Sequence, residues 1–373
     1  MRAAVYHGYD TINRYVVNHD IMNCTADGVV GNHLYSGRAL GLTEPWDIIQ
    51  LHPDLKSDWS AIQKHYRRIH IKHTKEVIWD LDLNHLSSQI GFQPSVFYFG
   101  PHEYRYWGDF DWLKTVEFIN SKNNFMHVAK ELEIPTPETH CFNSSMEIGI
   151  QAFMQFSFPC YVKAAISVSG VGIYRCETPL DLFRSLKKFD PAIPIQIQEE
   201  VLTDSFLNMQ YRIVGKNLIR LEASEQILDG FVHQGNRVPV EDAPWEIVDP
   251  MAEWLLEQGM KGIFAFDVAR TKTPDGYDYT AIECNPRYNG ASYPTLIAKK
   301  LNIPEWISLT LDTDYRKLDD IDLDGIEFDP RAEAGVIIIN WGTISQGKLM
   351  FLIAGSKSQQ NFYVKQLEER LAL

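Results

Sequence analysis

Residues 261–290, KGIFAFDVARTKTPDGYDYTAIECNPRYNG, are the stretch that decides the expected fold of this chain. Positions 263–270 form an apolar run rich in aromatic and β-branched residues, a composition typical of a buried strand. Asp275-Gly276 is a tight-turn signal, and positions 279–285 have the pattern of a second short strand. The stretch is therefore predicted to form a β-hairpin.

Three oxygen-bearing side chains are expected to meet on this hairpin. Asp267 lies near the end of the first strand, while Glu283 and Asn285 share one face of the second, because side chains two residues apart point the same way. Two carboxylates and an amide oxygen suit Mg²⁺, a hard cation that prefers oxygen ligands. Arg287 follows directly and could neutralise a phosphate or an acyl phosphate. The alternative, a surface hairpin with incidental acids, is disfavoured for the four residues taken together.

The hexapeptide IECNPR at 282–287 resembles the metal-binding E-x-N-x-R segment of the ATP-grasp superfamily, with Asp267 matching the acid on the preceding strand. The resemblance implies the ATP-grasp fold, in which two α+β lobes enclose ATP and Mg²⁺. It assigns the metal to Asp267, Glu283 and Asn285. It also gives Arg287 the role of stabilising an acyl phosphate and then a tetrahedral oxyanion.

Two lysines upstream fit the same family. Lys122 is expected at the start of a helix, and the resemblance makes it the first of two phosphate-reaching lysines. The second is Lys163, in the predicted strand at 158–165. An exposed surface lysine is the alternative for Lys122, and it would be favoured if that residue stood alone.

The run of small residues after Lys163, at 167–174, resembles the glycine-rich loop of ATP-grasp proteins. Small residues leave backbone N–H groups free to close over phosphates. The spacing is not that of a Walker A motif, and a plain β-turn is the alternative. The expected phosphate contacts are Ser169, Gly170 and Gly172.

The segment at 193–201 is a predicted strand in which apolar and polar positions alternate before two acids. In the ATP-grasp family this strand is the hinge between the lobes, and it contacts adenine and ribose. The matching positions here are Glu199, Glu200 and Val201. An aromatic residue stands where many members have a further ribose-binding acid, so Asp204 is the candidate substitute.

Further candidates lie on the next segments. Arg212, on the inner face of a predicted strand, is expected to assist Arg287 in holding a triphosphate or acyl phosphate. Residues 224–242 contain two glycines and several polar groups, which suits a mobile lid over a substrate or phosphate. His233 would then be a phosphate contact, and a merely solvated loop is an equally good reading.

The composition limits the class of protein. The 373 residues are 45% hydrophobic and 23% charged, which is ordinary for a globular protein with two or three lobes. The net charge of −14 disfavours nucleic acid as a partner. Five cysteines without a C-x-x-C pair indicate reduced thiols and a cytoplasmic protein. No apolar run is long enough to suggest a membrane span, and no signal-peptide core is apparent.

Three histidines, His65, His70 and His73, lie among basic residues. Their spacing fits no familiar pattern of metal ligands, so a basic, solvated helix face is predicted.

The expected domains follow the motifs. They are an α/β domain over 1–119, an ATP-grasp lobe with the lysines over 120–200, a lobe with the metal site over 201–330, and a C-terminal α/β piece over 331–373.

The family resemblance implies an ATP-dependent carboxylate–amine ligase that acts through an acyl phosphate and releases ADP and phosphate. The expected partners are a small-molecule carboxylate and an amine, possibly a peptide, and a homodimer is possible. Two alternatives stay open: a small-molecule kinase of the same fold, and a non-catalytic nucleotide-binding module. The full set of Asp267, Glu283 and Asn285 argues against the module, which would not need metal ligands.

Overall fold

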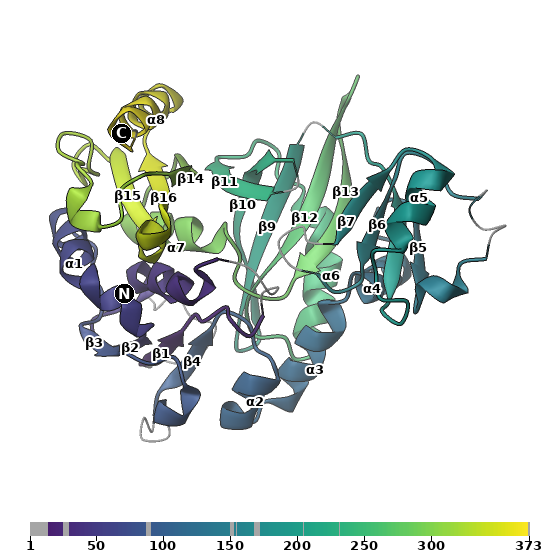
Figure 1. Cartoon of the computed structure of the whole chain (residues 1–373), viewed down its shortest axis with the longest axis horizontal. Helices are drawn as coiled ribbons and strands as arrows, with labels where there is room; N and C mark the ends of the chain where they lie inside the picture. The colour runs from purple at the N-terminus through teal and green to yellow at the C-terminus, as the bar shows by residue number, and fades with distance from the viewer. Residues whose placement is uncertain are drawn as a thin grey trace.

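The described part of the chain forms three β-sheets. Figure 1 shows them in a computed structural model of the chain. The structure describes residues 14–24, 30–86, 91–149, 153, 155–167, 172–203, 205–230 and 232–371. None of the helices in these ranges has the length and apolar character needed to cross a bilayer.

The first sheet is parallel, with the strand order β3-β2-β1-β4. Its strands are β1 (Tyr15–Asn18), β2 (Ile48–Gln50), β3 (Glu76–Ile78) and β4 (Gln93–Val96). The connections contain η1 (Asn32–Leu42), η2 (Pro53–Ser57), α1 (Trp59–Arg68) and η3 (Leu83–Leu86). Parallel strands require such crossover connections. The parallel sheet and its helical connections confirm the α/β character expected of this part of the chain.

Three helices lead from the first sheet to the second. They are α2 (Pro101–Trp107), α3 (Phe110–Ile119) and α4 (Lys122–Glu131). Helix α4 begins at Lys122 as predicted, because the Ser121 hydroxyl accepts a hydrogen bond from the N–H of Asn124 at 3.5 Å and caps the first turn.

The second sheet is antiparallel, has the order β5-β8-β6-β7 and lies on the right in Figure 1. It consists of β5 (Thr139–Phe142), β6 (Cys160–Ala164), β7 (Ile173–Cys176) and β8 (Ile195–Glu199). Helix α5 (Pro179–Leu186) packs on it through Leu182 and Leu186, which belong to its apolar core. Strand β6 carries Lys163, and strand β8 ends at Glu199.

The third sheet has eight strands in the order β13-β12-β9-β10-β11-β14-β16-β15. The strands are β9 (Ser205–Val214), β10 (Asn217–Asp229), β11 (Val232–Val238), β12 (Gly262–Thr273), β13 (Gly276–Asn285), β14 (Trp306–Asp312), β15 (Gly335–Asn340) and β16 (Lys348–Ala354). The remaining elements are η4 (Ser145–Glu147), α6 (Trp245–Glu257), α7 (Ser292–Leu301), η6 (Leu318–Asp320), η7 (Gly342–Gln346) and α8 (Lys357–Leu371). Strand β14 pairs with β16, so the sheet continues beyond residue 330.

The predicted hairpin is present as β12 and β13. Asp267 stands directly opposite Glu283, and a β-bulge follows Asp267. Opposed residues of antiparallel strands project to the same face, so the two carboxylates share a face, with Asn285 two residues along.

The expectation of a mobile lid over 224–242 is wrong. Most of that segment is the hairpin of β10 and β11, whose strands pair from Glu225 to Asp229. Strand β11 is also paired with β14 on its other side. The polar residues that suggested a loop alternate along strands whose backbone hydrogen bonds are made within the sheet.

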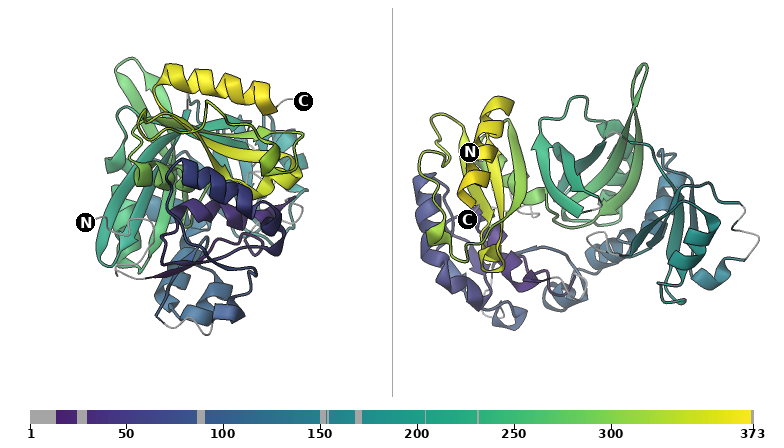
Figure 2. Two further views of the ribbon diagram at one scale, coloured as in Figure 1. Left: turned by 90° about the vertical axis from the view of Figure 1, so that its left-hand side faces the viewer. Right: turned by 45° about the horizontal axis from the view of Figure 1, so that its top comes forward.

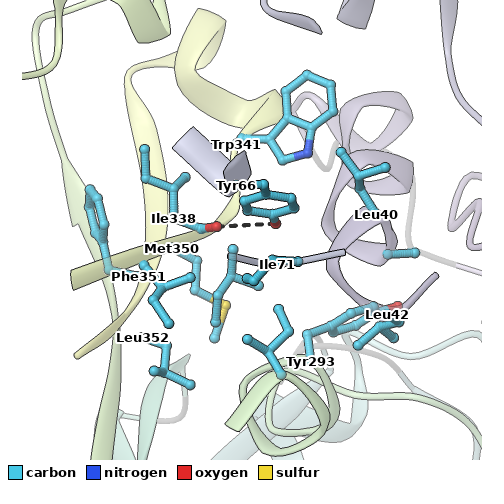
Figure 3. Packing of buried hydrophobic residues seen from close by; sticks show 14 of the residues in the cluster. Leu40, Leu42, Tyr66, Ile71, Tyr293, Ile338, Trp341, Met350, Phe351 and Leu352 are labelled. Carbon is cyan, nitrogen blue, oxygen red and sulfur yellow. Dashed lines mark hydrogen bonds between the residues drawn. The ribbon is translucent and has the colours of Figure 1, made fainter. Parts of the chain in front are cut away.

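The N-terminal part of the chain lies beside its last strands in Figure 2, and one apolar cluster joins the two parts, as Figure 3 shows. The Tyr66 hydroxyl donates a hydrogen bond to the carbonyl oxygen of Ile338 at 3.3 Å. The Trp341 indole N–H donates to the carbonyl oxygen of Gly37 at 2.7 Å. The two ends of the described chain therefore fold against each other.

The prediction of a solvated helix face is wrong for His65. Its side chain is buried, its Nδ1 lies 2.5 Å from Oε1 of Glu327, and its Nε2 accepts a hydrogen bond from the N–H of Ile338 at 3.0 Å. An Nε2 that accepts is unprotonated, so Nδ1 carries the proton and donates it to Glu327. His70 is exposed, as expected.

Candidate active site

Asp267 lies at the centre of a set of amide donors from three strands. Its Oδ1 accepts hydrogen bonds from Asn208 on β9 and Gln226 on β10, both at 2.8 Å. Its Oδ2 accepts from Asn285 on β13 at 3.0 Å. Because Asn285 donates through its nitrogen, its carbonyl oxygen can serve as a ligand on the same face.

Glu283 meets Lys122, the first residue of α4. Oε2 of Glu283 lies 2.9 Å from Nζ of Lys122, whose side chain is about nine-tenths buried. Nζ also donates to the Ser167 hydroxyl at 3.2 Å, and the backbone N–H of Lys122 donates to the carbonyl oxygen of Ala165 at 2.7 Å. The start of α4 is thus tied both to the segment after β6 and to the hairpin of the eight-stranded sheet.

Lys163 points from β6 into the same region. Its ammonium is buried and donates to Oε1 of Gln198 at 2.6 Å. Burial lowers the pKa of Lys163 to about 8, and the charge of Lys122 adds to that effect while the charge of Glu283 opposes it. The two lysines and the glutamate are therefore close enough to influence one another's charge state.

The two carboxylates differ in their electrostatic surroundings. Burial raises the pKa of Asp267, and the negative charge of Glu283 raises it further. Burial alone would also raise the pKa of Glu283, but the charges of Lys122, Lys163 and Arg287 together lower it. Glu283 therefore has the lower pKa of the two carboxyls, and a cation bound between them would favour the ionised form of Asp267.

The two arginines occupy different positions. Arg287 donates from Nη1 to Oδ1 of Asn120 at 3.1 Å, and its charge acts on both Asp267 and Glu283. Arg212 is buried on β9, on the same face as Asn208 but four residues further along. Its charge acts on Tyr288, the residue after Arg287.

The hinge acids are held in different ways. Oε1 of Glu199 accepts a hydrogen bond from the N–H of Glu138 at 3.3 Å. Glu200 is paired with Arg175 through Nε at 2.5 Å and Nη2 at 2.9 Å, and it accepts from the Tyr161 hydroxyl at 2.8 Å. Arg175 lowers the pKa of Glu200, so this carboxylate is ionised and already paired with Arg175.

His233 lies beneath the turn that follows Arg287. Its Nε2 lies 2.6 Å from Oδ1 of Asn236, and burial lowers its pKa. A Cβ added to Gly290 would meet the His233 ring at 2.5 Å, so ring and turn are in close contact. Val201 follows the end of β8, and Gly172, with φ of 76°, begins the return into β7.

The remaining candidates, Ser169, Gly170 and Asp204, lie outside the described residues.

Several residues that hydrogen-bond to the candidate site residues were not predicted from the sequence. Asn208 and Gln226 hold Asp267, Gln198 holds Lys163, and Asn120 holds Arg287. One signal was available, because polar residues at every second position from 208 to 212 mark one face of a strand that is otherwise apolar. The others lie far from their partners in the sequence, and only the folded chain brings them together.

No protein-family model and no curated protein matches this chain.

Solved structures nevertheless share its fold along nearly the whole length. An N5-carboxyaminoimidazole ribonucleotide synthetase in complex with ADP matches with a TM-score of 0.62 and 12% identity, covering 97% of this chain and 98% of the other. The phosphoribosylamine–glycine ligase of Thermotoga maritima matches with 0.60 and 14%, covering 95% and 96%. The L-amino acid ligase of Bacillus licheniformis matches with 0.55 and 12%, covering 97% and 99%. The chain therefore has the ATP-grasp fold.

Proposed function

We propose that this chain is an ATP-dependent ligase that joins a carboxylate to an amine through an acyl phosphate. One observation carries the proposal: Lys122, at the start of α4, contacts Glu283 of the eight-stranded sheet at 2.9 Å. Lys163, from the four-stranded sheet, influences the charge of the same glutamate. The lysines that we propose bind phosphate and the acids that we propose bind the metal therefore come from separate elements and lie close together, which is the arrangement that nucleotide-dependent phosphoryl transfer requires.

The residues present fit Mg²⁺. Asp267 and Glu283 face each other across β12 and β13, and their mutual repulsion would be relieved by a divalent cation. The donors are all oxygen atoms when the carbonyl of Asn285 is included, and Mg²⁺ prefers such a set. When bound, the ion would offset the charge that develops on the phosphates during transfer.

The chain's own residues would bind and orient the substrates. Lys122 and Lys163 would hold phosphate oxygens, together with the backbone of the loop from Ser169 to Gly172. Arg287, assisted by Arg212, would bind the acyl group. A carboxylate oxygen of the substrate would then attack the γ-phosphorus and release ADP, after which the amine nitrogen would attack the acyl carbon and release phosphate. Ordering of the two substrates supplies most of the rate in such a scheme, so no protein nucleophile is required.

The nucleotide contacts at the hinge are assigned to Glu199, Val201 and Asp204. Glu200 is a weaker candidate, because Arg175 already neutralises its carboxylate. His233 would act indirectly, by supporting the turn at Gly290. The amino-acid ligase among the similar structures supports amino acids, peptides or small organic acids as substrates. We place the reaction in the cytoplasm. We retain the domains expected from the sequence as a proposal, with the pieces 201–330 and 331–373 sharing the eight-stranded sheet.

The test is a screen for ADP release from ATP over amino acids, dipeptides and small acids, with Mg²⁺ present. We expect release of ADP and phosphate only when a carboxylate and an amine are supplied together. Mass spectrometry should then detect the amide product. A stable phosphorylated product would instead identify a kinase. Formation of AMP, or failure to bind Mg²⁺–ATP in calorimetry, would overturn the proposal.

A further inference from the structure

A second group of metal-ligating side chains lies in the N-terminal part of the chain, on residues that the ligase site does not use. His33 is the second residue of η1, His52 precedes η2, and Asp54 lies in the first turn of η2. One ligand atom from each of the three residues lies within 4.8 Å of the other two. We propose that His33, His52 and Asp54 bind a divalent transition-metal ion such as Zn²⁺.

The spacing of the ligand atoms suits coordination better than ion pairing. Oδ2 of Asp54 lies 3.3 Å from Nε2 of His33 and 3.5 Å from Nδ1 of His52. A charge-assisted hydrogen bond would be shorter, at about 2.7–2.9 Å. Ligands of a tetrahedral zinc ion, each about 2.0–2.1 Å from the metal, are separated from one another by about 3.3 Å. The 3.3 Å separation has this value, the 3.5 Å separation is close to it, and the third lies within 4.8 Å.

The hydrogen bonding of His52 identifies its Nδ1 as the unprotonated ring nitrogen, whose one lone pair accepts the N–H of Asp54. The N–H of Asp54 donates to Nδ1 of His52 at 3.3 Å, so Nδ1 carries no proton. An unprotonated ring nitrogen and a carboxylate oxygen 3.5 Å apart have no hydrogen between them and repel each other. A cation placed between them would replace the long hydrogen bond from the N–H of Asp54 to Nδ1 and would turn that repulsion into attraction, because metal binding requires the neutral imidazole.

The surroundings hold the ligands in place without a metal. The backbone N–H of His52 donates to the Ser36 hydroxyl of η1 at 3.3 Å, which ties the two segments together. The rings of His33 and His52 meet edge to face, with centroids 4.5 Å apart. Both histidines are roughly three-quarters buried, whereas Asp54 is 62% exposed. This leaves water access to one side, as in a site with three protein ligands and an open position.

The donor set separates this site from the one on the eight-stranded sheet. Two imidazoles and one carboxylate favour Zn²⁺, Co²⁺, Ni²⁺ or Cu²⁺, whereas the oxygen donors of Asp267, Glu283 and Asn285 favour Mg²⁺. An ion bound to His33 and to the residues at the start of η2 would cross-link η1 to the end of β2. It would therefore stabilise the N-terminal sheet even if the ligase activity were absent.

The experiment is a Co²⁺ titration of the full chain, monitored by visible absorption, in excess Mg²⁺ that would fill the oxygen-rich site proposed above. Tetrahedral nitrogen and oxygen ligands give Co²⁺ an intense band, and Zn²⁺ should displace it. Wild type is expected to bind one Co²⁺, and His33→Ala and His52→Asn should each bind at least tenfold more weakly. Asparagine keeps a side chain that can cap η2. His127→Ala, on the exposed face of α4, is the matched control and should bind like wild type.

Thermal unfolding supplies the second measurement. Zn²⁺ should raise the Tm of wild type and of His127→Ala, and it should not raise the Tm of His33→Ala or His52→Asn. Metal-free Tm values close to wild type would show that the variants fold. Equal Co²⁺ affinity in all four proteins, or absence of the tetrahedral band from wild type, would overturn the proposal.

Discussion

Glu283 connects the lysines to the proposed metal ligands, so its charge is the most informative one to remove. In Glu283→Gln, Lys122 keeps a possible hydrogen-bond acceptor but loses its negative partner at 2.9 Å. ADP release is expected to fall by about 10²- to 10³-fold, the usual loss when a group that stabilises transferred charge is removed. Steady-state assays against Glu222→Gln, which disrupts only the pair with Lys299, would measure it. Equal activity in the two variants would show that Glu283 is not part of the active site.

Lys163 offers a test at the same scale that separates binding from stability. Its buried ammonium has a pKa lowered to about 8, so burial costs the folded protein some of that residue's favourable solvation. In Lys163→Met, relief of this cost opposes the loss of the hydrogen bond to Gln198, and the free energy of unfolding should change by less than about 2 kcal/mol. The Kd for Mg²⁺–ATP should rise at least tenfold in calorimetry. Large destabilisation with unchanged affinity would identify a purely structural lysine.

At the scale of elements, the contact between β11 and β14 holds the two halves of the eight-stranded sheet together. A Cβ on Gly235 would lie 1.7 Å from the carbonyl oxygen of Ser308, so a side chain cannot be accepted without moving a strand. Gly235→Ala is expected to lower the free energy of unfolding by at least about 2 kcal/mol in urea titrations. Gly149→Ala, whose added Cβ would meet nothing within 4 Å, should leave it nearly unchanged. Similar values for both variants would show that the strands can separate at little cost.

At the scale of the whole molecule, the contact between the N-terminal and C-terminal parts of the chain is predicted to lose stability in acid. Burial lowers the pKa of His65 below 6.5, and Glu327 only partly opposes this. Burial alone would raise the pKa of Glu327, but hydrogen bonds from His65 and Arg68 lower it to about 2. Both groups have a lower pKa in the folded than in the unfolded chain, so the unfolded chain takes up more protons as the pH falls.

Stability should therefore begin to decline as the pH falls through about 6.5, where His65 titrates in the unfolded chain. A further loss should follow below pH 4.5 as Glu327 approaches its folded pKa of about 2. Urea midpoints measured between pH 7.5 and about 5 would show the first decline, and His65→Gln should reduce the slope in that range. An unchanged slope in His65→Gln would mean that other groups control the response to acid.

The elements that depend mainly on neighbouring residues could be predicted from the sequence alone. The alternation and turn in 261–290 predicted the hairpin, and Ser121 predicted the start of α4, because strand faces and helix caps depend on neighbours a few residues away. The order of Lys122, Lys163 and the E-x-N-x-R segment predicted the ATP-grasp fold. Local patterns failed where pairing partners were distant: β11 was predicted to be a loop, although β10 and β14 turn it into a central strand.

Which polar groups meet becomes evident only in the folded chain. The contacts of Glu283 with Lys122, of Asp267 with Gln226 and of His65 with Glu327 span 161, 41 and 262 positions of the chain. The cluster of His33, His52 and Asp54 likewise depends on how η1 packs beside the end of β2. Charge and hydrogen-bond energies fall steeply with distance in space, and sequence spacing does not report that distance across separate elements.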